Sequence, residues 1–270
     1  MTTLTPLRRF TFPILAECIS PDNFTGKTCK EAGRLNVWEG NKEKKLSDLF
    51  KIAESEPETA TITIQGDVSK VRRIGANMKT GAILINGNTG SHLGEEMRGG
   101  RIIVCGNVGG WAGSMMRNGV IEIHGDAGDY LGAPYRGSTQ AMRGGEIVVH
   151  GNVGNEAGCH MKGGVIKVHG SAGQFIGFHM SDGTVYVEKD CQSRIGACMT
   201  SGKIIVGGVL ESVLPTFTID CIRPKVKVGD EEAVEGPFYV FLGDIVEEGD
   251  GKLYVRKEKN PHLSHFEKLL

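Results

Sequence analysis

The chain has 270 residues, a net charge of −1, 40 glycines and only 6% aromatic residues. The near-zero charge argues against nucleic acid or an anionic membrane surface as a partner. No apolar run approaches the roughly 18 residues of a membrane span, and the N-terminal residues lack the basic start and apolar core of a signal peptide. Abundant glycine without a three-residue period excludes collagen and favours a turn-rich repeat protein.

The cysteines indicate a reducing compartment. Their number is odd and they form no CxxC pair, which fits free thiols better than a disulfide framework. The closely spaced thiolates of an iron–sulfur cluster are also missing from the sequence. We therefore expect a cytoplasmic protein that carries no cofactor of its own. The cysteines are Cys18, Cys29, Cys105, Cys159, Cys191, Cys198 and Cys221.

Residues 1–60 follow no repeat, and we predict that they form an N-terminal capping segment. Residues 35–39 predict a short strand, because Gly40 and Asn41 directly after it form a turn signal. Residues 45–52 predict a short helix. The acidic, proline-containing residues 54–58 predict a linker into the next part of the chain.

Residues 61–208 repeat with a period of 19 residues, which indicates stacked structural units. One unit carries a seven-residue insertion within residues 133–140. We expect the recurring glycines to occupy tight corners with positive φ, and the recurring methionines to fill the core. The glycine column is Gly75, Gly94, Gly113, Gly132, Gly158, Gly177 and Gly196, and the methionine column is Met78, Met97, Met116, Met142, Met161, Met180 and Met199.

Each repeat ends in a strand with period-2 alternation, so alternate residues share one face. Two apolar columns point inward; one is Ile83, Ile102, Ile121, Ile147, Ile166, Val185 and Ile204, and the other begins at Ile85. We predict an all-β fold, a right-handed parallel β-helix of about seven 19-residue coils. Residues 61–208 would form the repeat domain, between capping segments at 1–60 and 209–270.

The residues that point outward between the inner columns are mostly apolar. An apolar outer stripe must be covered, either by a terminal segment or by another protein, and the sequence leaves both open. Tyr135 and Arg136 in the insertion are residue types that often anchor interfaces. The stripe is Leu84, Ile103, Glu122, Val148, Lys167, Tyr186 and Ile205, and its apolar and aromatic members are candidate docking residues for a partner, as are Tyr135 and Arg136.

Two columns contain residue types that bind metals. His124, His150 and His169 occupy equivalent positions in successive repeats, about 4.8 Å apart at the backbone. His160, His179 and Cys198 form the second column. Imidazole and thiolate groups suit zinc or copper, but outward polar ladders explain both columns more simply. We therefore predict no metal-binding, cofactor-binding or catalytic residue, although sequence alone leaves metal binding by the first column open.

The 19-residue glycine and methionine repeat resembles a glycine-rich β-helix that two families share. One is the C-terminal domain of the glutamate synthase large subunit, and the other is the C subunit of formylmethanofuran dehydrogenase. The flanking motifs favour the second family, although Lys189 replaces the glycine that usually begins the seventh coil. The motifs are Pro21–Lys27, Trp38–Asn41, Arg73–Gly75, Tyr135–Gly137, Leu214–Phe217, Gly243-Asp244 and Leu253–Val255.

The resemblance implies a non-catalytic scaffolding subunit of a cytoplasmic oxidoreductase complex. That complex reduces carbon dioxide to a formyl group on methanofuran, the first step of methanogenesis. The implied partners are pterin-binding, formate-dehydrogenase-like subunits with tungsten or molybdenum, an amidohydrolase-like subunit with a metal centre, and ferredoxin-like subunits with iron–sulfur clusters. Two alternatives stay open: the C subunit of a bacterial formyltransferase/hydrolase complex, and a free-standing solenoid that acts as a binding module.

Overall fold

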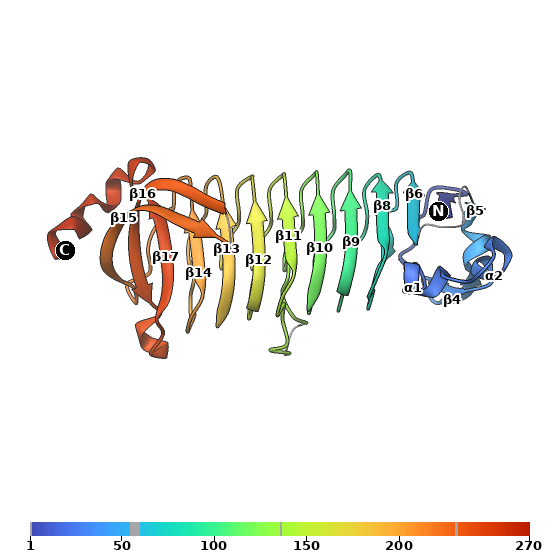
Figure 1. The fold of residues 1–270 in the computed structure, drawn as a ribbon, viewed down its shortest axis with the longest axis horizontal. Coiled ribbons are helices and arrows are strands. Elements are labelled where there is room, and N and C mark those ends of the chain that lie inside the picture. The colour runs from blue at the N-terminus through green and yellow to red at the C-terminus, as the bar shows by residue number, and fades with distance from the viewer. Residues whose placement is uncertain (1, 55–59, 136, 230–231) are drawn as a thin grey trace.

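The structure is a computed structural model that describes residues 2–54, 60–135, 137–229 and 232–270. Its strands form a 13-stranded sheet and a four-stranded sheet. The strands of the large sheet stand side by side along an elongated molecule, with the N-terminal segment at one end and the C-terminal segment at the other (Figure 1). None of the helices in the described residues is long and apolar enough to cross a membrane.

The large sheet takes its strands from the whole length of the chain. In spatial order they are β15 (Thr218–Val228), β16 (Glu232–Gly243), β17 (Gly251–Arg256), β14 (Lys203–Val206), β13 (Asp182–Val187), β12 (Lys162–Val168), β11 (Glu146–Val149), β10 (Asn118–Ile123), β9 (Arg98–Val104), β8 (Ala82–Asn86), β6 (Thr61–Gln65), β1 (Thr2–Pro6) and β5 (Phe50–Glu54).

The remaining elements are short and lie mostly towards the chain ends. The small sheet has the order β4 (Lys42–Lys45), β3 (Asn36–Glu39), β2 (Ile14–Leu15) and β7 (Val71–Arg72). The helices are α1 (Pro21–Phe24), α2 (Cys29–Gly33) and the 3₁₀ helices η1 (Leu46–Asp48), η2 (Ile245–Glu247), η3 (Lys257–Lys259) and η4 (Pro261–Leu269).

The repeat sets the register of the middle of the large sheet. β8 to β14 pair in parallel, and Ile83, Ile102, Ile121, Ile147, Ile166, Val185 and Ile204 are successive partners. A second line of single-residue parallel bridges runs from Val68 through Val108 and Val153 to Leu210. The predicted inward column is confirmed, because each of its members is at most 1% exposed.

The predicted right-handed parallel β-helix is wrong. The large sheet is mixed: β1 pairs antiparallel with β5, β15 with β16, and β16 with β17. The physical reason is that the flanking segments do not repeat, so their strands return by hairpins rather than by the parallel step of the repeat. They also extend the sheet beyond the repeats, where exposed strand edges would otherwise invite association. The division into segments at residues 60 and 208 stays a prediction.

The glycine and methionine columns have the predicted structural roles. The seven column glycines all have positive φ, between +62° and +71°. The seven column methionines are 0% exposed and belong to the main core. Both columns are therefore explained by corner geometry and by packing.

The N-terminal segment departs from its prediction in one place. The strand expected at residues 35–39 is observed as β3. Residues 45–52 do not form a single helix; they form the short η1 and then enter β5. Phe50 and Ile52 are register partners of Pro6 and Leu4 in β1, and this pairing outweighs local helix propensity. Most of the predicted linker lies outside the described residues.

Candidate functional site

The outward stripe on the large sheet is covered at one end only. The hairpin of β15 and β16 lies over the last repeats (Figure 1), where Tyr186 and Ile205 pack with Val226, Val228 and Phe238 in a separate apolar cluster. Tyr186 is 7% and Ile205 0% exposed. The C-terminal segment is therefore the cover for this end of the stripe.

The other end of the stripe has no such cluster over it in the described part of the chain. Leu84, Ile103 and Val148 come from β8, β9 and β11, and each is half-buried. The parallel register makes Leu84 and Ile103 direct partners. We call Leu84, Ile103 and Val148 the open stripe. Whether these residues contact a partner stays a prediction.

Glu122 and Lys167 interrupt the stripe with charges that are paired within the chain. Arg101 Nη2 lies 2.6 Å from Glu122 Oε2, and Lys167 Nζ lies 3.0 Å from Glu146 Oε1. Arg101 and then His150 hold the pKa of Glu122 below its usual range. This face of the sheet thus combines apolar side chains with neutralised charges.

A second group of polar residues gathers where the insertion meets the earlier repeats. The ring centroids of Tyr135 and His92 lie 5.2 Å apart. On its other side His92 stacks on Trp111 at 5.4 Å, and Trp111 in turn stacks on Tyr130 at 4.4 Å. The nearby side chain of Glu95 is 0% exposed. Tyr135 therefore folds back on the chain while remaining 38% exposed, and Arg136 lies outside the described residues.

The charge of Glu95 is compensated by Arg73. Arg73 Nε donates to Glu95 Oε2 at 2.6 Å, and its Nη1 contacts Glu17. The hydrogen bond to Glu95 raises the pKa of Arg73, whereas burial lowers the pKa of His92. Burial, and then interaction with Glu95, raises the pKa of Tyr135 to about 12. Glu95 Oε1 has no hydrogen-bond partner within the described residues, so this acid is desolvated and only partly satisfied.

Arg73 and Tyr135 belong to the sequence motifs of the resemblance, but the sequence does not single out Glu95 or His92. Glu95 directly follows the corner glycine Gly94, and His92 lies two residues before that glycine. The repeat shows that both residues flank a corner, but nothing in the spacing shows that the insertion returns to them. The contact is a tertiary feature of the one irregular repeat.

The histidines of both predicted columns stack on one another. His124, His150 and His169 stack with centroid distances of 4.8 and 5.2 Å. His160 and His179 stack at 4.8 Å, while Cys198 donates its backbone N–H to Asp244 at the C-terminal end. In the structure Glu122 also lies beside the first histidine column, with its Oε1 3.2 Å from His150 Nε2. The sequence pattern could have revealed this neighbour, because Glu122 and His124 are two residues apart and therefore share one face of the strand.

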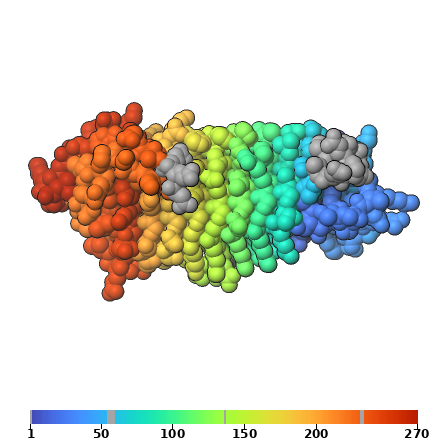
Figure 2. All heavy atoms as spheres, viewed as in Figure 1, coloured from blue at the N-terminus to red at the C-terminus, as the bar shows by residue number. Residues whose placement is uncertain are grey.

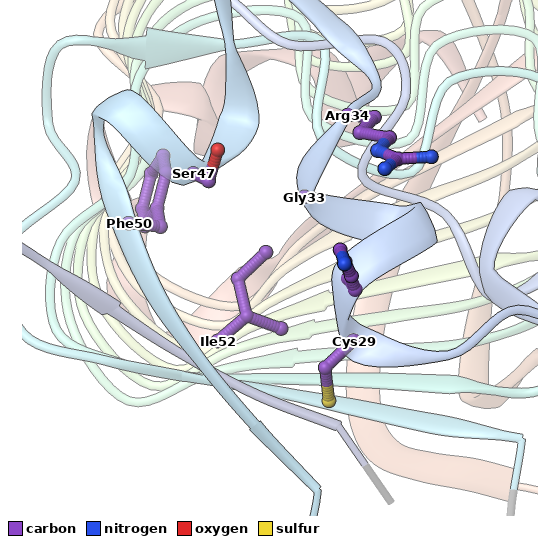
Figure 3. Close-up of a pocket in the computed structure, with 7 residues that line it drawn as sticks. Cys29, Gly33, Arg34, Ser47, Phe50 and Ile52 are labelled. Carbon is purple, nitrogen blue, oxygen red and sulfur yellow. The ribbon is translucent and has the colours of Figure 1, made fainter.

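A shallow pocket opens in the N-terminal segment between α2 and β5 (Figure 3). Its lining combines the apolar Phe50 and Ile52 with the basic Lys30 and Arg34. Ser47 and Cys29 add a hydroxyl and a thiol. The lining is a mixed surface between two short elements and brings together no pair of groups of evident chemical use.

Comparison with known proteins finds a relative that matches nearly the whole chain. The chain is similar to the C subunit of the tungsten-containing formylmethanofuran dehydrogenase 2 of Methanococcus maripaludis, with 48% identity over 93% of this chain and 94% of the relative. It is also similar to the C subunit of the molybdenum-containing formylmethanofuran dehydrogenase 1 of Methanothermobacter marburgensis, with 44% identity over 33% of this chain. That alignment spans 22% of the longer relative. No family model matches the chain.

A solved structure shares the fold. In the formyltransferase/hydrolase complex of Methylorubrum extorquens with methylofuran, one chain is similar to this one with a TM-score of 0.84 and 26% identity. The superposition covers 94% of this chain and 99% of that one. The similarity in fold thus extends over nearly the whole of a chain from a known assembly.

Proposed function

The chain belongs to the family of the C subunit of formylmethanofuran dehydrogenase, and from this premise we propose that it is a non-catalytic scaffolding subunit of such a complex. The match to the Methanococcus maripaludis protein carries the proposal, since it spans almost the whole of both chains. The complex would act in the cytoplasm. It would reduce carbon dioxide to a formyl group on methanofuran, the first step of methanogenesis.

The proposed division of labour places the redox chemistry on other subunits. A pterin-binding subunit with tungsten or molybdenum would make formate, and an amidohydrolase-like subunit with a metal centre would transfer it to the amine of methanofuran. Ferredoxin-like subunits with iron–sulfur clusters would supply the electrons. The elongated shape of this chain supports a scaffolding role, because a rod exposes much surface to several neighbours at once (Figure 2).

The open stripe is the proposed contact with one of these subunits. Half-buried apolar side chains on three strands give a surface that gains stability when a partner removes it from water. Tyr135 supports a second contact, since its ring is 38% exposed and packs beside that of His92. A pre-ordered aromatic side chain costs less entropy on binding.

A second candidate is the C subunit of a formyltransferase/hydrolase complex, which lacks the redox step. The structural similarity to the Methylorubrum extorquens complex favours it, with a TM-score of 0.84. The sequence identity is 26% there and 48% with the dehydrogenase relative. We therefore place the dehydrogenase first.

Affinity purification of the tagged chain from its native cells tests the proposal. Mass spectrometry of the co-purifying proteins should find a pterin-binding redox subunit and an amidohydrolase-like subunit in constant proportion. An amidohydrolase-like and a formyltransferase subunit without a pterin-binding one would select the second candidate. A chain that elutes alone would overturn both and leave a free-standing binding module.

A further inference from the structure

The outward face of the sheet carries, where β10 and β11 end, a cluster of ligand-type side chains that the scaffolding role does not use. We propose that Glu122, His124 and His150 form a binding site for one zinc ion. One ligand atom from each residue lies within 4.8 Å of the other two. The inference goes beyond the proposed function, because scaffolding requires no metal on this chain.

The sheet register creates the cluster. Glu122 and Val148 are direct partners in the parallel pair of β10 and β11. His124 and His150 each follow two residues later, on the same outward face. Their rings stack with a centroid distance of 4.8 Å and an angle of 18°. Glu122 lies within β10, and the two histidines follow directly after the last residues of β10 and β11. Their backbone N–H groups donate to carbonyl groups of the neighbouring strands, which fixes where the two side chains start.

The interatomic distances suit a tetrahedral ion. Bonds of about 2.0–2.2 Å at the tetrahedral angle place ligand atoms about 3.4 Å apart. Glu122 Oε1 already lies 3.2 Å from His150 Nε2 and 3.7 Å from His124 Nε2. The ligand atoms of the two imidazoles lie within 4.8 Å of each other, so the rings must rotate to bring both nitrogens onto one ion. The His150 and His124 side chains are 40% and 49% exposed, which leaves room for this rotation.

The donor set favours zinc over a hard cation. Two imidazole nitrogens and one carboxylate oxygen are ligands that zinc prefers, whereas magnesium and calcium prefer oxygen ligands. Three protein ligands leave a fourth position for water or for a ligand group from a partner. Because the site is open to solvent on the outside of the sheet, such a group could reach it.

Arg101 orients the carboxylate of Glu122. Its Nη2 donates to Glu122 Oε2 at 2.6 Å, so the carboxylate is oriented and its Oε1 faces the histidines. Hydrogen bonds of this kind, made to a ligand rather than to the ion, fix the direction of a metal ligand. His169 stacks on His150, but its Nδ1 is engaged by Glu188 Oε2 at 2.6 Å. Within the described residues, His169 does not belong to the group of converging ligand atoms, so we treat it as a neighbour of the site.

The second ladder provides a matched control. His160 and His179 stack at 4.8 Å, like His124 and His150. Within the described residues, they do not belong to a group of three ligand-type side chains with converging atoms. A stacked histidine pair is thus present twice in the same protein, once with a converging carboxylate and once without it.

The test is titration of the full, chelator-stripped chain with zinc in competition with a chromophoric chelator. We expect one zinc ion per chain, and affinity at least about 10-fold weaker in Glu122→Gln and in His150→Ala. His179→Ala should bind as the wild type does. Cobalt bound in place of zinc should show no thiolate charge-transfer band, which separates this site from the cysteines.

Two results would overturn the proposal: no binding at micromolar zinc, or unchanged affinity in both Glu122→Gln and His150→Ala. Circular dichroism of each variant checks that it is folded. Glu122→Gln keeps the shape of the side chain and removes its charge, so it supplies the test even if His150→Ala folds poorly.

Discussion

At the scale of single residues, the corner glycines connect the sequence pattern most directly to the fold. Gly113 has a φ of +63°, and a Cβ there would lie 2.4 Å from Cδ1 of the buried Ile147. The packing thus excludes a side chain, and the left-handed backbone conformation adds strain for any residue other than glycine. Gly137, in the insertion, has a φ of +84° but nothing within 4 Å of a Cβ.

Gly113→Ala should lower the free energy of unfolding by about 2–4 kcal/mol, because left-handed strain and overpacking of the core add. Gly137→Ala should cost only the strain, about 1–2 kcal/mol. Urea unfolding of both variants measures the difference. Equal losses would show that packing at the corner of the repeat contributes nothing.

Tyr135 gives the chain a pH dependence at alkaline pH. Burial and the Glu95 carboxylate raise its pKa to about 12 in the folded state, against about 10 in an unfolded chain. Above pH 10 the unfolded chain loses a proton that the folded chain keeps, so the free energy of unfolding falls as the pH rises from 10 to 12.

Tyr135→Phe should make this fall shallower between pH 10 and 12. The pKa of Tyr239 is also about 12, raised by burial and by its hydrogen bond to Glu267, so the double variant Tyr135→Phe/Tyr239→Phe should flatten the curve further. Burial also raises the pKa of the Cys18, Cys159 and Cys191 thiols, and these groups contribute to any remaining slope. Thermal unfolding at several pH values between 10 and 12 measures this slope. A slope that Tyr135→Phe leaves unchanged would show that Tyr135 does not cause the pH dependence.

At the scale of elements, the hairpin of β15 and β16 decides which part of the outward stripe is available. It buries Tyr186 and Ile205, whereas the open stripe has no comparable cover in the part of the chain that the structure describes. The two halves of one column therefore have different proposed roles: the first to meet a partner, the second to hold the C-terminal segment.

Ile205→Ala should cost about 2–5 kcal/mol, as expected for a fully buried isoleucine. Ile103→Ala, at an equivalent but half-buried position, should cost about 1 kcal/mol or less. Chemical unfolding of the two variants compares them. Equal costs would indicate that the hairpin does not pack on Ile205 in solution.

Ile103→Asp should weaken assembly with the partner subunit and leave the isolated chain folded, because the charge must lose its water when the open stripe is covered. Pull-down of partner subunits with the variant and with the wild type measures this. Val209→Asp, at an exposed position outside the stripe, is the control. Undiminished pull-down by Ile103→Asp would remove the open stripe from the interface.

The repeats were predictable because each position recurs in several units. Columns such as Ile83 to Ile204 and the corner glycines follow from a 19-residue period and from alternation alone. The contacts of Tyr135 with His92 and Glu95 were not predictable, because the insertion occurs once. The helix predicted at residues 45–52 is wrong for a similar reason. The pairing of β5 with β1, which is distant in the sequence, overrides the local helix preference.

At the scale of the whole molecule, the segments that flank the repeats turn a parallel sheet into a mixed one. The repeat alone predicts parallel pairing throughout, and this is what the middle of the sheet shows. The ends add antiparallel strands, and the result is one mixed sheet of 13 strands. The same flanking segments carry most of the family motifs. They distinguish this family from other repeat proteins better than the repeat does, although the repeat does not predict their structure.

The most direct test of the proposed function follows the chain and the activity together. Native extract is separated by size, and each fraction is assayed for formylmethanofuran dehydrogenase activity and for the chain. We predict that both elute in one peak far above the 29.0 kDa of the single chain. The purified chain alone should have no activity. A chain that elutes at its own mass, with the activity in other fractions, would contradict the proposal.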